Sequence, residues 1–276
     1  MGHLKKILLY AVLVSVALLL LFPVVYVLLG AFKSNRELMV GNTILPTTWH
    51  IENFSQAWQL ANFAQYTWNS IFLATSVTAL KVLMASMTAY ALVRRNFPGR
   101  ALILAGLAGA LFLDVGPVTF RPLYQLAVTL KLHNSLWGAI LILSAHQATT
   151  IFPLVGFFRS IPKELDEAAT VDGCSFFRIY WSIILPVSRP ALAVVALLAF
   201  RQAWNEFLLP GVFTMARPDL RPLTVGVAAL RYAESAAAQW NIMMAGAAMS
   251  ILPILVIYLF ANKSMISGLT SGSVKG

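Results

Sequence analysis

Long apolar stretches alternate with shorter polar connectors along the chain, and this pattern sets the expected architecture. About 20 apolar residues in a helix cross the hydrocarbon core of a bilayer. Six stretches approach that length: 7–32, 68–92, 101–120, 136–158, 190–209 and 243–261. The third and fifth are the weakest, because Asp114 interrupts one and Arg201 and Glu206 interrupt the other. We expect an all-α membrane protein with six transmembrane helices.

The first stretch begins as a signal peptide would, with Lys5 and Lys6 before an apolar run. The run from 7 to 31 is far longer than the usual apolar region of about 7–15 residues, and no small-x-small cleavage site follows it. We therefore expect an uncleaved membrane span.

Basic residues favour one side of the membrane. In the six-span arrangement, eleven Lys and Arg residues lie at the termini and in the second and fourth connectors, against seven in the other three connectors. Lys and Arg concentrate in cytoplasmic loops. Both termini and the connector 159–189 are therefore expected on the cytoplasmic face of a bacterial or archaeal membrane.

Composition supports the membrane assignment and excludes several classes of function. The chain of 276 residues is 59% hydrophobic and 11% charged, whereas soluble domains carry about 25% charged residues. The net charge of +10 comes from basic residues that flank apolar runs rather than from clusters interleaved with aromatics, so nucleic acid is not the expected partner. The single cysteine, Cys174, excludes an intramolecular disulfide, and no metal-binding pattern is present.

The fourth connector contains a polar segment, 160–186, with a two-helix pattern of its own. Ser160 is expected to cap the first helix, and three acidic residues then suit the positive end of the helix dipole. Asp172 and Gly173 predict a break, since glycine readily adopts positive φ. A second helix is expected from Ser175, with an apolar stripe at helical spacing. From these residues alone, a helix pair lying on the membrane surface and one that docks another protein both remain open.

A specific motif lies in this segment. Glu167, Ala168 and Ala169 are followed after three residues by Gly173, and after nine more by Ile183, Leu185 and Pro186. The pattern resembles the EAA loop of the membrane subunits of binding-protein-dependent ABC importers. Three further segments are similar to the MalG-like carbohydrate branch of that family: 98–100, 203–206 and 268–276. Lys81 and Asp114 depart from it, because relatives are mostly apolar at those places.

The resemblance implies a fold, a set of partners and a function. It implies the type I ABC importer permease fold, with an N-terminal helix and loop (1–66), a permease domain (67–262) and a cytoplasmic tail (263–276). The implied partners are a second, MalF-like permease, two ABC ATPase subunits and an extracytoplasmic binding protein that delivers a carbohydrate. In the family the EAA loop docks in a groove of the ATPase, where its glutamate, here Glu167, pairs with a basic residue. The residues so implied in ATPase coupling are Glu167, Ala168, Ala169, Asp172, Gly173, Ile183, Leu185 and Pro186.

The sequence carries no nucleotide-binding or catalytic motif. There is no G-x-x-x-x-G-K-[ST] phosphate loop, no H-E-x-x-H and no G-x-S-x-G. We therefore expect a transport subunit that is not an enzyme and holds no cofactor, with ATP and Mg bound by the partner ATPase.

The solute path is less determined by the sequence. Ionisable groups in mid-membrane cost about 2.5–3.5 kcal/mol and usually face protein or water. Lys81 is expected to pair internally with Asp114 or Glu206. Residues with side chains suited to sugar binding are the candidate lining: Tyr124, Gln125, Gln202, Trp204, Asn205 and Glu206. Trp204 is equally suited to the lipid interface.

Two alternatives remain. An ABC permease for a non-sugar solute such as glycerol phosphate would have the same fold. An ion-coupled secondary transporter would use Lys81, Asp114 and Glu206 as a relay, but it would leave the EAA loop unexplained, and no internal repeat of the kind such carriers show is visible. The identity of the solute is beyond the sequence.

Overall fold

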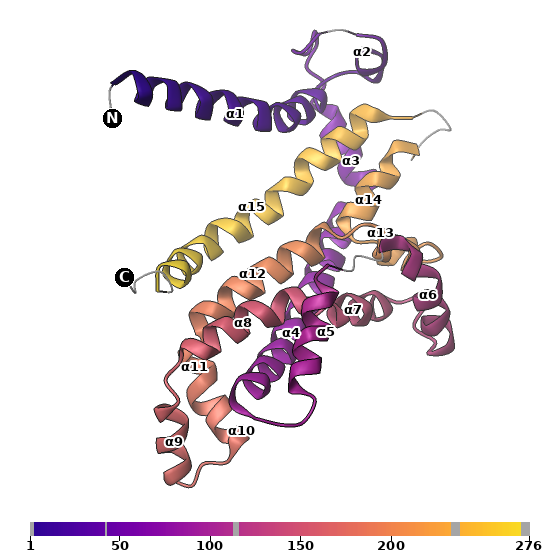
Figure 1. The fold of residues 1–276 in the computed structure, drawn as a ribbon. Helices are drawn as coiled ribbons and strands as arrows, with labels where there is room; N and C mark the ends of the chain where they lie inside the picture. The colour runs from indigo at the N-terminus through magenta and orange to yellow at the C-terminus, as the bar shows by residue number, and fades with distance from the viewer. Residues whose placement is uncertain (1–2, 42, 113–115, 233–237, 272–276) are drawn as a thin grey trace. The chain divides into compact units, whose positions relative to one another are not determined.

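All the secondary structure in the described residues is helical (Figure 1). The computed structural model describes residues 3–271 except 42, 113–115 and 233–237. The chain forms two compact units, the first of residues 1–67 and 223–253, the second of residues 68–222 and 254–276. The boundary between the units near residue 67 lies where the permease domain was expected to begin. The units have no boundary after residue 262, where the cytoplasmic tail was expected to begin, so the domain assignment stays a prediction.

The first unit contains a long apolar helix that packs little within this chain. Its elements are α1 (His3–Gly30), α2 (Asn35–Val40), α3 (Glu52–Leu60), α14 (Leu223–Ala229), the 3-10 turn η4 (Leu230–Tyr232) and the first part of α15 (Trp240–Ser271). Every side chain of α1 from residue 5 to residue 26 is exposed, and nearly all are apolar. A helix that is apolar all round is suited to lipid, so α1 fits the first predicted span.

Two asparagines tie this unit together. Asn53 of α3 is 3% exposed; its amide donates to the carbonyls of Ala31 and Lys33, both at 2.9 Å, and its oxygen accepts from Asn241 at 2.9 Å. Asn35 likewise binds the carbonyl of Ala238 and the N–H of Trp240. These bonds satisfy backbone groups that the ends of α1 and α15 leave open.

The second unit is a packed helical bundle. Its elements are α4 (Phe63–Arg94), α5 (Arg100–Ala110), η1 (Gly116–Thr119), α6 (Phe120–Thr129), α7 (Leu136–Ala145), α8 (Ala148–Ser160), α9 (Glu164–Val171), α10 (Phe176–Ile179), the π-helix η2 (Tyr180–Ile184), α11 (Leu185–Val187), α12 (Arg189–Asn205), α13 (Leu208–Phe213) and η3 (Pro218–Leu220). The helix α8 packs against both α5 and α12. On α4, Ala85 and Ala89 are fully buried, and such small residues let membrane helices approach closely.

One polar loop of this unit is fixed to the start of α4. The amide of Asn69 donates to the carbonyls of Asp219 at 2.8 Å and Arg221 at 3.1 Å. The Arg217 guanidinium donates two hydrogen bonds to the carboxylate of Asp219, which holds the pKa of that carboxyl below its ordinary value. The loop therefore has a defined conformation.

The predicted spans are recovered unequally. Two helices are by themselves long and apolar enough to cross a membrane, namely α1 from Lys5 and α4, and two further bent pairs reach that length when each is counted as one span. These pairs are α7 with α8, bent by 47°, and the segment Phe176–Val187 with α12, bent by 81°. The count of six spans stays a prediction.

Two predicted spans are shorter than expected. A continuous helix over 101–120 is wrong, because α5 ends at Ala110 and has 11 residues, about 16 Å of helix. Gly116 then takes φ +53°, and Pro117 has no N–H to continue a helix. The helix expected over 190–209 ends at Asn205, because Glu206 takes extended backbone and its side chain accepts a hydrogen bond from the N–H of Leu209.

A close contact in the first unit yields a prediction. A Cβ atom added to Gly226 of α14 would lie 2.0 Å from the ring of Tyr66, whereas one added to Gly106 of α5 would meet nothing within 4 Å. Overpacking of this kind costs about 1–3 kcal/mol, and glycine in an open helix position costs about 1 kcal/mol relative to alanine. We expect Gly226→Ala to lower the thermal unfolding midpoint of the purified protein by several degrees and Gly106→Ala to leave it unchanged or raise it. Equal midpoints for the two variants would contradict this packing.

Candidate functional site

The segment 160–186 begins with a break after α8 rather than with a capped helix. The Ser160 hydroxyl donates to the carbonyl of Phe157 within α8, so the prediction that Ser160 caps the next helix is wrong. Pro162 explains the break, since a residue before proline favours extended backbone, and Ile161 has φ −76° and ψ 126°. The residue that precedes α9 is Lys163, whose carbonyl accepts hydrogen bonds from the N–H groups of Asp166 and Glu167.

A glycine turn joins α9 to α10, as the sequence predicts. Gly173 has φ +79°, and the N–H of Cys174 bonds back to the carbonyl of Ala169 at 2.9 Å. Ser175 then caps α10, because its hydroxyl accepts a hydrogen bond from the N–H of Arg178 at 3.4 Å. The expected pair of short helices with a bend at Asp172 and Gly173 is confirmed.

The second helix of the pair widens before it meets α12. Residues Tyr180–Ile184 form a π-helix, in which the N–H of Leu185 reaches the carbonyl of Tyr180. Pro186 accounts for this widening, since it lacks an N–H and its ring crowds the carbonyl four residues earlier. The chain then turns by 81° between Val187 and Arg189. We call this turn the elbow; it connects the segment directly to α12.

The eight residues implied in ATPase coupling divide into an inner and an outer set. Ala169 is 5% exposed and belongs to a core cluster with residues of α4, α8 and α12, against which Ile183 and Leu185 also pack. The outer set is exposed: Glu167, Ala168, Asp172 and Gly173. Pro186 is half-buried at the elbow. The segment thus has one face packed on the bundle and one face free for another protein.

A polar contact that the sequence did not predict fixes α9 to the end of α4. The Tyr90 hydroxyl donates to one carboxylate oxygen of Asp166 at 2.9 Å, and the Arg94 guanidinium lies 2.9 Å from the other. Arg94 also donates to the carbonyl of Ile161 at 3.0 Å. The side chains of Arg94 and Asp166 are 6% and 17% exposed, so the pair is largely shielded from water. We call Tyr90, Arg94 and Asp166 the Asp166 clamp.

Aromatic contacts fix the second helix of the pair to the same helix. The ring of Phe176 stacks on that of Tyr90 with 4.6 Å between centroids. The Arg95 guanidinium lies over the Phe176 ring, 4.5 Å from its centroid. Deeper in the bundle, the hydroxyls of Ser86 and Tyr180 are 2.7 Å apart. Both short helices are therefore attached to the last turns of α4.

In the candidate solute path, Lys81 donates its hydrogen bond to a residue that was not among its expected partners. The residue is 2% exposed, and its ammonium donates to the side-chain oxygen of Gln202 on α12 at 3.0 Å. Glu206 accepts a hydrogen bond from the N–H of Leu209 and also attracts the Lys81 ammonium electrostatically, while Asp114 lies outside the described residues. Internal pairing of the buried cation is thus observed, with Gln202 as the hydrogen-bond partner and Glu206 as the nearby opposite charge.

The other candidate lining residues lie on two separate elements. Tyr124 and Gln125 belong to α6, where the Tyr124 ring contacts His133 and Phe213 edge-on. On α12, Trp204 is 3% exposed and stacks on Phe200, so its ring is a packing element and leaves no exposed face for a solute or for lipid. Asn205 is exposed and donates to the carbonyl of Arg201. These six residues stay candidates, with Trp204 the least accessible.

Known proteins resemble the chain over nearly its whole length. Residues 7–265 match the family described as "Binding-protein-dependent transport system inner membrane component". The diacetylchitobiose uptake system permease protein NgcG of Streptomyces coelicolor is 33% identical over 96% of this chain and 88% of its own length. The trehalose/maltose transport system permease protein MalG of Thermococcus litoralis is 33% identical over 99% of this chain and 98% of its own.

A solved structure shows the same fold. A chain in the crystal structure of a bacterial ABC transporter involved in the import of the acidic polysaccharide alginate superposes with a TM-score of 0.77, at 22% identity, over 95% of this chain and 98% of that chain. Three observations lead to the same family: the helical bundle, the glycine-bent helix pair on its surface and the match over residues 7–265. The chain belongs to the inner-membrane components of binding-protein-dependent transport systems and has the permease fold of ABC importers.

Proposed function

We propose that this chain forms one half of the path by which a carbohydrate crosses the cytoplasmic membrane, driven by ATPase subunits that grip the segment 160–186. The observation that carries the proposal is the Asp166 clamp, which joins a segment with a free outer face to the end of a membrane-spanning helix. Membership of the family makes the chain a transport subunit that works with a partner permease, an ATPase and a binding protein. An ion-coupled secondary transporter is thereby excluded.

The outer face of the segment is suited to docking. Glu167, Ala168 and Asp172 are exposed there, and among the described residues no basic side chain forms an ion pair with Glu167. A free carboxylate beside a small alanine lets a basic groove of an ATPase approach closely and pair with it. We assign Glu167 to that contact, with ATP and Mg held by the ATPase rather than by this chain.

Force applied to α9 has two routes into the bundle. The Asp166 clamp passes it to α4, and the continuous chain through η2 and the elbow passes it to α12. The Lys81–Gln202 hydrogen bond joins the same two helices about three turns away from the clamp along α4. Because packed elements switch between discrete arrangements, movement of the segment would shift α4 and α12 together between inward-facing and outward-facing states.

Orientation and partners complete the proposal. We propose that both termini and the segment 160–186 lie in the cytoplasm, where ATP is available, and the distribution of Lys and Arg among the connectors supports this orientation. We propose a MalF-like second permease, two ATPase subunits and an extracytoplasmic binding protein. The named solutes of the relatives, diacetylchitobiose and trehalose/maltose, favour an uncharged oligosaccharide as the cargo of this chain, with a glycerol phosphate as the alternative.

The cargo is tested by uptake. The full complex, reconstituted in vesicles with its binding protein, is expected to accumulate labelled maltose, trehalose or diacetylchitobiose only when ATP is present on the ATPase side. Glycerol 3-phosphate is the matched probe for the alternative. Uptake of glycerol 3-phosphate alone would overturn the carbohydrate assignment, and uptake of any solute without the ATPase subunits would overturn the mechanism.

Glu167→Ala tests the docking face. Because the carboxylate would be lost without any buried contact being disturbed, we expect normal insertion and assembly, at least a tenfold fall in transport and ATPase activity that the loaded binding protein no longer stimulates. Glu164→Ala is the matched control, since Glu164 is also exposed in the first turn of α9. Solute-stimulated ATPase activity at the wild-type level in Glu167→Ala would count against the assignment.

Asp166→Asn tests the clamp. Breaking a shielded ion pair costs about 3–5 kcal/mol, so we expect a lower unfolding midpoint and, below it, fewer solute molecules moved per ATP hydrolysed. Tyr90→Phe removes one hydrogen bond, worth about 1 kcal/mol, and should have a smaller effect in the same direction. The exchanged pair Arg94→Asp with Asp166→Arg should recover part of the coupling ratio. An unchanged ratio of transport to hydrolysis in well-folded Asp166→Asn would refute the role of the clamp.

A further inference from the structure

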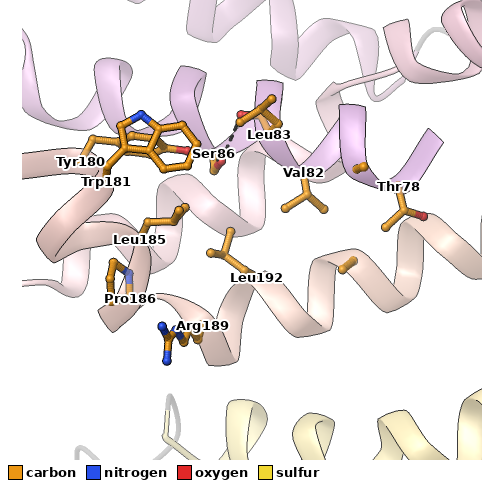
Figure 2. A pocket seen from close by; sticks show the side chains of 12 residues that line it. Thr78, Val82, Leu83, Ser86, Tyr180, Trp181, Leu185, Pro186, Arg189 and Leu192 are labelled. Atoms are coloured by element: carbon orange, nitrogen blue, oxygen red, sulfur yellow. Dashed lines mark hydrogen bonds between the residues drawn. The ribbon is translucent and has the colours of Figure 1, made fainter. Parts of the chain in front are cut away.

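A groove lies inside the elbow. Its walls are formed by five residues of α4, four residues of the segment between Tyr180 and Pro186, and three residues of α12, and its volume is about 520 Å³ (Figure 2). It is open to the outside of the bundle. The helical segments on both sides of the 81° turn line the groove together with α4. A molecule that fills the groove therefore touches α4 and α12, the two helices to which the segment 160–186 would pass force.

The walls of the groove offer mainly apolar contacts, because their hydroxyl groups already have hydrogen-bond partners within the protein. Val82, Leu83, Leu185 and Leu192 supply aliphatic side chains to the lining, and Val82 points toward Leu192 (Figure 2). The hydroxyls in the lining are already bonded within the protein. Thr78 donates to the carbonyl of Ala74 at 2.7 Å. The Ser86 hydroxyl donates to the carbonyl of Leu83 at 3.0 Å and is 2.7 Å from the Tyr180 hydroxyl. A sugar would find few free partners here, whereas a hydrocarbon chain would lose nothing by entering.

One end of the groove is cationic. Arg189, the first residue of α12, is exposed and lines the groove near Pro186, whereas Trp181, which is 50% exposed, lies beyond Leu185 (Figure 2). Among the described residues, no carboxylate lies within ion-pair distance of Arg189. Basic pockets between membrane helices on the cytoplasmic side bind the head groups of anionic lipids.

We propose that the elbow groove is a binding site for an anionic phospholipid, with the lipid phosphate on the Arg189 guanidinium and an acyl chain between Leu83 and Leu192. The guanidinium fork matches phosphate oxygens in geometry and charge. The α4 wall runs from Ser86 to Thr78, about 12 Å of helix, which accommodates the first part of an acyl chain. The assignment rests on the proposed function in one respect, the cytoplasmic placement of the elbow.

The site has a consequence for coupling. Because the lipid contacts both arms of the elbow and α4, it fills the space into which the arms would close and holds the angle between them. A helix of the partner permease that filled the same space would leave the Arg189 guanidinium without an anion unless it also brought a carboxylate. The unpaired cation therefore favours the lipid, which supplies its anion at this level of the bilayer.

Lipid binding is measured on the whole complex, purified and placed in phosphatidylcholine nanodiscs, by titration with phosphatidylglycerol and native mass spectrometry. We expect Arg189→Gln to weaken the phosphatidylglycerol affinity about tenfold, which corresponds to about 1.4 kcal/mol. Arg178→Gln is the matched control, because Arg178 is exposed on the adjoining helix α10 and does not line the groove. Leu83→Trp should reduce the binding with the arginine intact, since the larger ring fills the groove.

Two results would overturn the proposal. One is equal phosphatidylglycerol affinity in Arg189→Gln and the wild type. The other is complete cross-linking of Leu83→Cys to the partner permease, which would show that a protein helix occupies the groove. If Arg189→Gln does not assemble, Leu83→Trp decides the same question. Binding is measured without solute or nucleotide, so its failure leaves the uptake result standing, and a failed uptake experiment with intact lipid binding counts against the proposed function alone.

Discussion

The shielded ion pair between Arg94 and Asp166, with the Tyr90 hydroxyl on the same carboxylate, is the contact on which the rest of the account depends. The segment 160–186 is short, and its outer residues Glu167, Ala168, Asp172 and Gly173 are exposed. Without the clamp, a push on α9 would bend the glycine turn and be lost. With it, breaking the contact costs about as much as a few ordinary hydrogen bonds together, so α9 and the end of α4 move as one body.

A small number of contacts also joins α4 to α12 within the bundle. The clamp holds α4, the elbow continues into α12, and the Lys81–Gln202 hydrogen bond joins these helices in the interior of the bundle. The buried ammonium is held there by its hydrogen bond to Gln202 and by the nearby charge of Glu206, so Lys81 is not free to bind a solute, whereas the exposed Gln202 stays a candidate. The elbow groove lies where all these elements meet, and this position explains why its occupant would act on coupling rather than on the solute.

The sequence predicted those features of the structure that depend on residues close together in the chain. The long apolar helices α1 and α4, the positive φ of Gly173 and the start of the second short helix at Ser175 all follow from residues within one or two turns. The clamp could not be predicted in the same way, since Tyr90 and Asp166 are far apart in the chain and meet only because Ala85 and Ala89 let the helices pack closely. The one feature of the sequence that could have indicated the clamp is the spacing of four residues between Tyr90 and Arg94, which places both on one face of a helix. Trp204 shows the converse: its type suited a binding surface, but packing against Phe200 decided its place.

Rigid movement of α9 with the end of α4 is measured most directly by a distance between spin labels at Val171 and Phe97, in a background in which Cys174 is replaced by serine. Both labelled positions are exposed. The complex is measured without nucleotide and with ATP trapped. The account predicts one narrow distance distribution, unchanged between the two states, which broadens when Asp166→Asn breaks the clamp. A wild-type distance that shifts by several ångströms on ATP binding would show that the coupling segment moves independently of α4 and would contradict the account.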